Sequence, residues 1–411
     1  MTPRDRIAER ARALDAADGL AAYRAAFTVP KGVIYLDGNS LGALPVKTVD
    51  VLARVVTQEW GEGLIRSWNS AGWFDMAARI GGKIAPLVGA APHEVIACDS
   101  TSVNLFKLIA AALQMRPGRS VILSEPGNFP TDLYMIAGLE AQGLAQRRLA
   151  PRERLADALD EDVALLMLTH VHYKTGALHD MAALTRAAHE AGALVLWDLS
   201  HSTGALPVDL RGVDADFAVG CGYKYLCGGP GAPAFAFVAE RHHGRFAQPL
   251  TGWFGHAAPF AFSDDYEPAS GIGQLQCGTP PVLGLAALEV GVDLIAEIGV
   301  APLYAKSRAL SEFFLACLAD LDVALSLVSP AASAQRGSQL SFRHPDAYAI
   351  CQALIARGVI GDFRAPDVLR LGFAPAYLRF ADVAEAARHL AEVVTAGEWQ
   401  NPAFRQRAAV T

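Results

Sequence analysis

Short apolar runs alternate with amphipathic stretches through the first two thirds of the chain. Each run is continuous, and the runs lie at residues 95–98, 121–123, 164–168, 193–197, 217–219 and 234–238. Continuous apolar runs are typical of strands in a sheet that helices cover on both faces. Helical patterns lie between the runs, at residues 103–115, 130–142 and 181–191. This order of elements predicts an α/β fold built on a large, mostly parallel sheet.

The pattern changes after about residue 281. Long helical patterns cover residues 282–298 and 301–321, and a mixed stretch ends in a helical pattern at 381–396. A turn-rich segment at residues 270–281 separates the two patterns. We therefore expect a large α/β domain at residues 30–280 and a smaller C-terminal α+β domain at residues 281–411. An N-terminal helical segment, residues 1–29, is expected to pack on the small domain.

Composition excludes several classes of protein. The 411 residues carry 35 Lys and Arg against 42 Asp and Glu, and 35 − 42 gives a net charge of −7. This acidic balance argues against nucleic acid or an anionic membrane as the main partner. Hydrophobic residues make up 52% of the chain and charged residues 19%, which supplies a large core and excludes disorder.

No segment of the sequence has the pattern of a targeting signal or a membrane span. The first residues are charged, and no apolar run approaches the roughly 18 residues that cross a bilayer. The six cysteines form neither a CxxC pair nor a zinc-binding spacing. We therefore expect a soluble, reduced, cytoplasmic protein without a metal site.

Polar residues stand where the predicted strands end, and parallel sheets bind ligands at these ends. Thr101 and Ser102 follow the first run and suit a phosphate, although Ser102 would also serve as an ordinary helix cap. Phe129 follows the second run, and it would either stack on a flat ring or belong to the core. Thr169 opens a polar stretch after the third run that lacks the carboxylate or Cys ligands of a zinc site.

The next two strand ends are more informative. Asp198 ends a buried run and needs a partner, which would be a turn, an Arg or the cationic ring nitrogen of a cofactor. Lys224 lies between two tyrosines in a Gly-rich, uncharged stretch, where a desolvated Lys can form a Schiff base with an aldehyde. A phosphate-binding helix start, an aromatic residue, a strand-end Asp and a Lys 26 residues later together predict a site for pyridoxal 5'-phosphate (PLP).

Several longer motifs point to one family. The chain reads Tyr-Leu-Asp-Gly-Asn-Ser-Leu-Gly at 35–42 and His-Val-His-Tyr-Lys-Thr-Gly at 170–176. Further matches lie at residues 128–132, 197–201, 223–225, 228–231 and 369–375. On these motifs, which span roughly residues 33 to 380, the chain resembles the kynureninases, PLP-dependent enzymes of the aspartate-aminotransferase-like fold type I, class V group.

The resemblance implies a role for each matching position. Lys224 would carry PLP, and Asp198 would bind its pyridinium nitrogen. Tyr223 would act as an acid or base and contact the phosphate, and Arg370 would clamp the substrate's α-carboxylate with its planar fork. The other positions that match cofactor contacts are Thr101, Ser102, Phe129, Asp132, Thr169 and His201.

The resemblance also implies a homodimer, because Trp253 and Thr279 match positions that reach the phosphate from the partner subunit. Two positions depart from the family pattern. Gly222 stands where a Ser or Thr is frequent, and Cys227 stands where Asn is common. Loss of a hydroxyl beside the phosphate would weaken cofactor binding without removing a bond-breaking group.

The activity that the resemblance implies is hydrolysis of L-kynurenine to anthranilate and L-alanine, and of 3-hydroxykynurenine if the pocket admits it. It belongs to tryptophan catabolism through the kynurenine pathway, which also leads to NAD biosynthesis. Trp60, Trp68, Trp253 and Phe254 are candidates for the wall of the aniline pocket. The alternatives are another class V enzyme, an aminotransferase or a cysteine desulfurase, and a non-catalytic protein of this fold. A desulfurase needs a Cys on a mobile loop, whereas Cys351 lies in a helical pattern.

Overall fold

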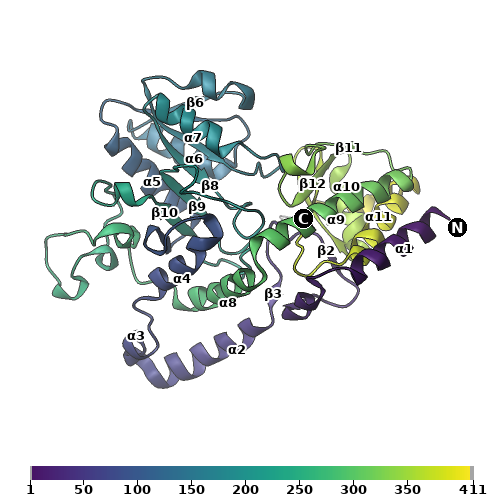
Figure 1. Ribbon diagram of the computed structural model, residues 1–411, viewed down its shortest axis with the longest axis horizontal. Coiled ribbons are helices and arrows are strands. Elements are labelled where there is room, and N and C mark those ends of the chain that lie inside the picture. The colour runs from purple at the N-terminus through teal and green to yellow at the C-terminus, as the bar shows by residue number, and fades with distance from the viewer. Residues whose placement is uncertain (1, 408–411) are drawn as a thin grey trace.

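The computed structural model describes residues 2–407. It consists of two parts that meet near the middle of the molecule (Figure 1). The first part surrounds a seven-stranded sheet. In spatial order its strands are β4 (Val95–Ala97), β10 (Phe235–Val238), β9 (Phe217–Gly220), β8 (Leu194–Asp198), β7 (Val163–Thr169), β5 (Val121–Ser124) and β6 (Gln146–Leu149). β10 pairs antiparallel with both neighbours, and all other pairs are parallel. The predicted mostly parallel α/β sheet is therefore confirmed.

Helices of this part pack on the sheet and on one another. They are α2 (Lys47–Arg54), α3 (Ser67–Ser70), α4 (Met76–Ile84), α5 (Thr101–Met115), α6 (Pro130–Ala141), α7 (Met181–Glu190) and α8 (Val282–Ile298). A π-helix, Val55–Gly63, continues α2 and was not predicted. Strand β6 was also missed, because its Gln-Arg-Arg-Leu sequence is that of an exposed edge strand with no apolar run.

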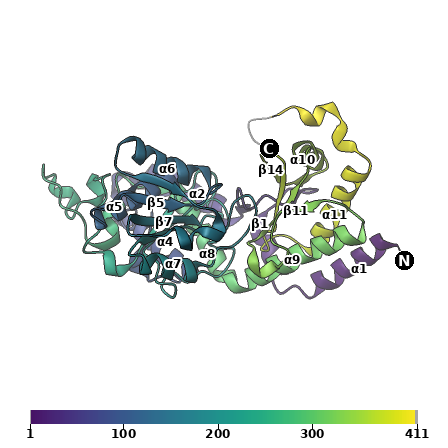
Figure 2. The ribbon, with the colours of Figure 1, turned by 90° about the horizontal axis from the view of Figure 1, so that it is seen from above.

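The second part surrounds a four-stranded antiparallel sheet. Its strands, in spatial order, are β11 (Ser326–Leu327), β12 (Gln339–Arg343), β15 (Val368–Gly372) and β14 (Asp362–Arg364). The helices of this part are α9 (Val300–Asp320), α10 (Ala347–Ala356), α11 (Phe380–Thr395) and, from the N-terminus, α1 (Pro3–Ala16). Helix α1 lies against α11 and α9 (Figure 2). The predicted domain limits at residues 29 and 280 stay a prediction.

Two small strand pairs involve residues 27–45: one lies within this segment, and the other joins it to the second part. β1 (Phe27–Thr28) pairs with β3 (Leu44–Pro45), and β2 (Ile34–Tyr35) pairs with β13 (Val359–Ile360) beside the four-stranded sheet. None of the helices within residues 2–407 is long and apolar enough to cross a membrane.

A loop of the first part is held by the second part. The carbonyl oxygen of Tyr173 accepts a hydrogen bond from Gln339 (3.0 Å), and that of Lys174 accepts one from the Ser341 hydroxyl (2.6 Å). Gly337 N donates to the carbonyl oxygen of Gly176 at 2.8 Å. The loop after β7 is therefore bound along its length by β12 and the residues before it.

Candidate active site

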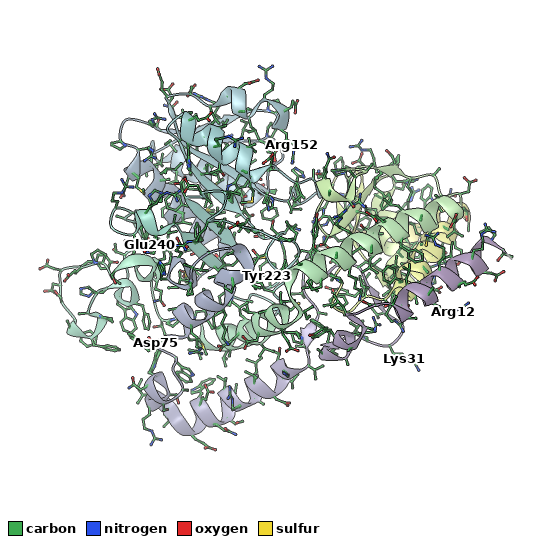
Figure 3. The ribbon with its side chains drawn as sticks, viewed as in Figure 1. Arg12, Lys31, Asp75, Arg152, Tyr223 and Glu240 are labelled. Carbon is green, nitrogen blue, oxygen red and sulfur yellow. The ribbon has the colours of Figure 1, made fainter. Side chains whose placement is uncertain are left out.

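A cavity of about 480 Å³ opens at the carboxyl ends of the parallel strands. The predicted site residues that line it are Thr101, Ser102, Phe129, Thr169, Asp198, His201, Tyr223 and Lys224. Figure 3 shows Tyr223 near the middle of the molecule, where the two parts meet. Parallel β/α order brings these residues together although they are spread over more than a hundred positions, because every strand points its carboxyl end to the same edge.

Lys224 is buried in the wall of this cavity. Its Nζ lies 3.0 Å from Nε2 of His201, 5.7 Å from the ring centre of Phe129 and 5.9 Å from that of Tyr223. Burial, followed by the charge of Lys224, lowers the pKa of His201 well below its usual value, so the imidazole is neutral. Lys224 thus presents an amine to the cavity among neutral rings.

Asp198 ends β8 directly opposite Thr169 at the end of β7. Its Oδ1 accepts a hydrogen bond from Ser200 N at 2.8 Å, and burial raises its pKa. Asp132 does not line the cavity: it lies fully buried behind Thr169, whose hydroxyl is 3.1 Å from its Oδ2. Burial and the nearby Asp198 raise the pKa of Asp132 well above its usual value, and its Oδ1 has no hydrogen-bond partner among the described residues. The pair of carboxyl groups is therefore suited to a cation at the cavity end.

The turn before α5 is shaped by residues that the sequence argument did not select. Ser100, not Ser102, caps α5, because its side chain accepts a hydrogen bond from Val103 N. The capping alternative for Ser102 is thus wrong, and its hydroxyl stays available at the cavity. Asp99 adopts a left-handed conformation (φ +49°), and the buried Lys107 holds its carboxylate.

The structure explains one of the two departures from the family pattern, at Gly222, and gives no reason for the other, at Cys227. A Cβ on Gly222 would lie 2.3 Å from the carbonyl oxygen of Pro233 and 2.9 Å from Leu288, so this position has no room for a Ser or Thr. Cys227 has φ +52°, a conformation that Asn tolerates better than Cys. Burial raises the pKa of Tyr223, so the phenol keeps its proton.

Trp253 and Thr279 lie outside the cavity and are exposed. Trp253 is in edge-on contact with Phe254, with ring centres 4.8 Å apart, and Phe254 in turn contacts Trp68 at 5.8 Å. Three of the four aromatic residues that we considered for the aniline pocket therefore cluster together, whereas the fourth, Trp60, lines a separate cavity of about 430 Å³. Within a single chain none of them lines the cavity of Lys224.

Arg370 does not line the cavity either, but it touches a residue that does. Its guanidinium donates to the carbonyl oxygen of Tyr173 at 2.6 Å, to the Ser40 hydroxyl at 2.8 Å and to both carboxylate oxygens of Asp362. Tyr173 lines the cavity, as do Ser200 and Pro281. Tyr173 and Ser200 were not among the predicted site residues. They lie inside the motifs at 170–176 and 197–201, so these motifs already indicated that both residues are near the site.

Comparisons with known proteins identify the family to which this chain is similar. The family model described as Kynureninase C-terminal domain matches residues 303–390. The chain is 51% identical over 412 aligned residues to a kynureninase of Burkholderia mallei, covering 98% of this chain and 99% of that protein. It is 50% identical to a kynureninase of Pseudomonas fluorescens, covering 97% and 98%.

Solved structures share the fold at low identity. A cysteine desulfurase of Thermococcus onnurineus matches with a TM-score of 0.77 and 19% identity, covering 91% of this chain and 98% of that one. A C-DES mutant with glycine covalently linked to the PLP cofactor matches with a TM-score of 0.80 and 18% identity, covering 90% and 99%. The expected fold is therefore confirmed, and on near-complete coverage at half identity this chain belongs to the kynureninase family.

Proposed function

We propose that the protein is a kynureninase that hydrolyses L-kynurenine, with PLP as cofactor, to anthranilate and L-alanine. The observation that carries this proposal is the cavity in which Lys224, Asp198 and Phe129 meet, in a chain half identical to kynureninases over nearly its full length. Family membership makes the chain a hydrolase of carbon–carbon bonds in ketonic substrates.

The cavity fits PLP on chemical grounds. Burial raises the pKa of both Asp198 and Asp132 and so disfavours their ionised forms, and Oδ1 of Asp132 has no hydrogen-bond partner among the described residues. A pyridinium nitrogen beside Asp198 would supply the missing positive charge and stabilise the ionised carboxylate. Thr101, Ser102 and the first N–H groups of α5 offer donors to a phosphate. Phe129 offers a ring face, and Lys224 offers the amine that carries the cofactor's aldehyde carbon.

In the reaction, the residues of this chain move protons and hold the substrate. When bound, PLP supplies an electron sink for negative charge at the substrate's α-carbon. Lys224 Nζ accepts the proton that leaves the α-carbon, and the neutral His201 keeps this amine aimed into the cavity by the 3.0 Å contact. Tyr223, which burial keeps protonated, donates a proton to the β-carbon when a water adds to the side-chain carbonyl and the Cβ–Cγ bond breaks.

The substrate's α-carboxylate is assigned to Arg370. Its guanidinium has five N–H groups, and four of them are engaged by Tyr173, Ser40 and Asp362. Binding of a carboxylate therefore uses the remaining N–H and displaces one of the neutral acceptors. The Tyr173 carbonyl is the nearest of these to the cavity wall, which supports entry of the carboxylate from that side.

The active unit that we propose is a homodimer with shared sites. Phe260 and Phe262 are 61% and 80% exposed, and they adjoin Trp253: the ring centre of Phe260 lies 5.8 Å from that of Trp253 and 6.3 Å from that of Phe262. A partner subunit that covered this surface would bring Trp253 and Thr279 to its neighbour's cavity. A cytoplasmic location and a place in the kynurenine pathway are parts of the same proposal.

The cysteine desulfurase alternative lacks its nucleophile. Cys351 lies in α10, is fully buried, and burial raises its pKa, so its thiol is inert. Five of the six cysteines are buried, and the sixth, Cys277, does not line the cavity.

The proposed activity is tested by adding L-kynurenine to the PLP-loaded protein and following anthranilate fluorescence, with L-alanine measured in parallel. Equimolar anthranilate and alanine are expected. Release of sulfide from L-cysteine, or amino transfer without anthranilate, would assign the cavity to another class V activity.

A further inference from the structure

Arg370 is held by a carboxylate that faces it across the small sheet. Asp362 in β14 is the direct partner of Arg370 in the antiparallel β14–β15 pair. Nε of Arg370 lies 2.8 Å from Oδ1 of Asp362, and the NH2 nitrogen donates to Oδ2, with both side chains almost fully buried. This two-point contact fixes the plane of the guanidinium before any substrate arrives.

The motif at residues 35–42 adds a second carboxyl group to the same cluster. Leu36 N donates to Ile360 O and Leu36 O accepts from Gly372 N, both at 2.7 Å, so this segment lies between β13 and β15. Ser40 then donates its hydroxyl to Oδ2 of Asp362 at 2.8 Å. Asp37 enters the cluster here, and its Oδ1 is buried without a hydrogen-bond partner among the described residues.

The charged groups that face Asp37 are Asp362 and Arg364 from β14 and Arg370 from β15. The other titratable groups that face it are uncharged, because burial raises the pKa of each of them: Tyr35, Tyr225, Cys351 and Tyr377. Two guanidinium groups therefore stand against two carboxyl groups.

The two carboxyl groups differ in their hold on a proton. Burial opposes ionisation of Asp362, but the charge and hydrogen bonds of Arg370 outweigh it and lower the pKa of Asp362. Burial, followed by the charge of Asp362, raises the pKa of Asp37 to about 7. Of the two groups, Asp37 is therefore the one that holds a proton near neutral pH, and its buried, unpartnered Oδ1 agrees with this, because an ionised carboxylate would leave a negative charge on that oxygen.

We propose, on the basis of the proposed function, that Asp37 and Asp362 form one proton-sharing pair behind Arg370, and that this proton sets the charge with which Arg370 meets the substrate's carboxylate. With the proton present, the cluster carries a net charge of +1 and attracts a third carboxylate. When the proton leaves, two positive and two negative charges cancel, and the incoming carboxylate is repelled by both aspartates. Asp37 and Asp362 are thus positioning residues that act through Arg370.

The test compares the holoenzyme with Asp37→Asn, which keeps the shape of the protonated carboxyl group and cannot ionise. A proton with a pKa of about 7 is roughly 90% present at pH 6 and 10% present at pH 8. The ratio of kcat/KM for L-kynurenine, wild type over Asp37→Asn, should therefore fall about tenfold from pH 6 to pH 8. Titrations elsewhere in the enzyme or substrate cancel in this ratio. Asp367→Asn is the matched control: Asp367 lies between β14 and β15, is partly exposed and pairs with Arg343 outside this cluster, so its variant should give a flat ratio.

A second measurement needs no variant. In the wild-type holoenzyme, the inhibition constant of L-alanine should rise about tenfold from pH 6 to pH 8 relative to that of kynuramine, which has the amine but lacks the carboxylate. A flat kcat/KM ratio for Asp37→Asn, or equal pH dependence of the two inhibitors, overturns the proposal. If L-kynurenine is not turned over at any pH, the proposed function fails, while the binding of L-alanine, read from the cofactor's absorbance, still decides whether the pair acts on a carboxylate.

Discussion

The substitution Gly222→Ala should destabilise the protein, although a Gly→Ala substitution at a position with room for the Cβ stabilises a protein. The Cβ of Gly222→Ala would lie 2.3 Å from the backbone carbonyl oxygen of Pro233, which has no flexible end to move aside. Overpacking of this kind costs about 1–3 kcal/mol, and a stiffer unfolded chain returns about 0.4–1 kcal/mol. The difference lowers the free energy of unfolding by about 1.3 kcal/mol at the midpoints of these ranges, and by about 2.6 kcal/mol at most.

Because Pro233 lines the cavity, the same displacement should also weaken PLP binding. Gly222→Ser restores the hydroxyl that is frequent in the family, yet it carries the same Cβ, so it should bind PLP no more tightly than wild type. The assays are urea unfolding of the apoprotein and titration of the apoprotein with PLP, followed by absorbance.

The control is Gly138→Ala, in helix α6, where an added Cβ meets no atom within 4 Å. It should stabilise the protein by about 0.5–1 kcal/mol and leave PLP binding unchanged. Unchanged stability and unchanged PLP affinity in Gly222→Ala would refute the reasoning, since the backbone would then accommodate a contact that the packing forbids.

Three further predictions concern the proposed roles. Borohydride should attach PLP to the peptide that contains Lys224, and Lys224→Ala should bind PLP weakly and lose turnover; labelling of another peptide contradicts the assignment. Mixing inactive Lys224→Ala with an inactive Thr279 or Trp253 variant should restore part of the activity through one intact hybrid site, whereas a fully active monomer on a sizing column would exclude shared sites. Arg370→Ala should keep PLP absorbance, and the fall in its kcat/KM for L-kynurenine should correspond to a loss of about 2–5 kcal/mol of transition-state stabilisation, of which Arg370→Lys recovers only part. An unchanged kcat/KM would move the carboxylate site to Arg364 or Arg379.

The strands that the sequence alone predicted are those whose residues are buried on both faces of the sheet and therefore form a continuous apolar run. Strand β7 shows this, since all seven of its residues are buried. The strand of the large sheet that was missed, β6, is an edge strand whose residues are mostly exposed, so it carries no such run, whereas the opposite edge strand, β4, is buried and was predicted. At the site, Lys224 and Asp198 were predictable because the topology brings strand ends to one edge.

The rest of the site depends on geometry that no local pattern encodes. The position of Asp362 opposite Arg370 follows from the register of β14 against β15, and the cap at Ser100 depends on one side-chain rotamer. The roles of Trp253 and Thr279 depend on a second subunit, so they stay predictions.

The cavity is lined by residues at the strand ends of the large sheet and, through the loop after β7, by a residue that is bound to the small sheet. Asp198 and Lys224 stand at the ends of strands of the large sheet, whereas the Tyr173 carbonyl is bound by Gln339 and Arg370 of the small one. A rotation of the small sheet against the large one would therefore displace Tyr173, which lines the cavity, and change the cavity's width. The fold thus couples the position of the small sheet to the position of one cavity wall through the hydrogen bonds of this loop.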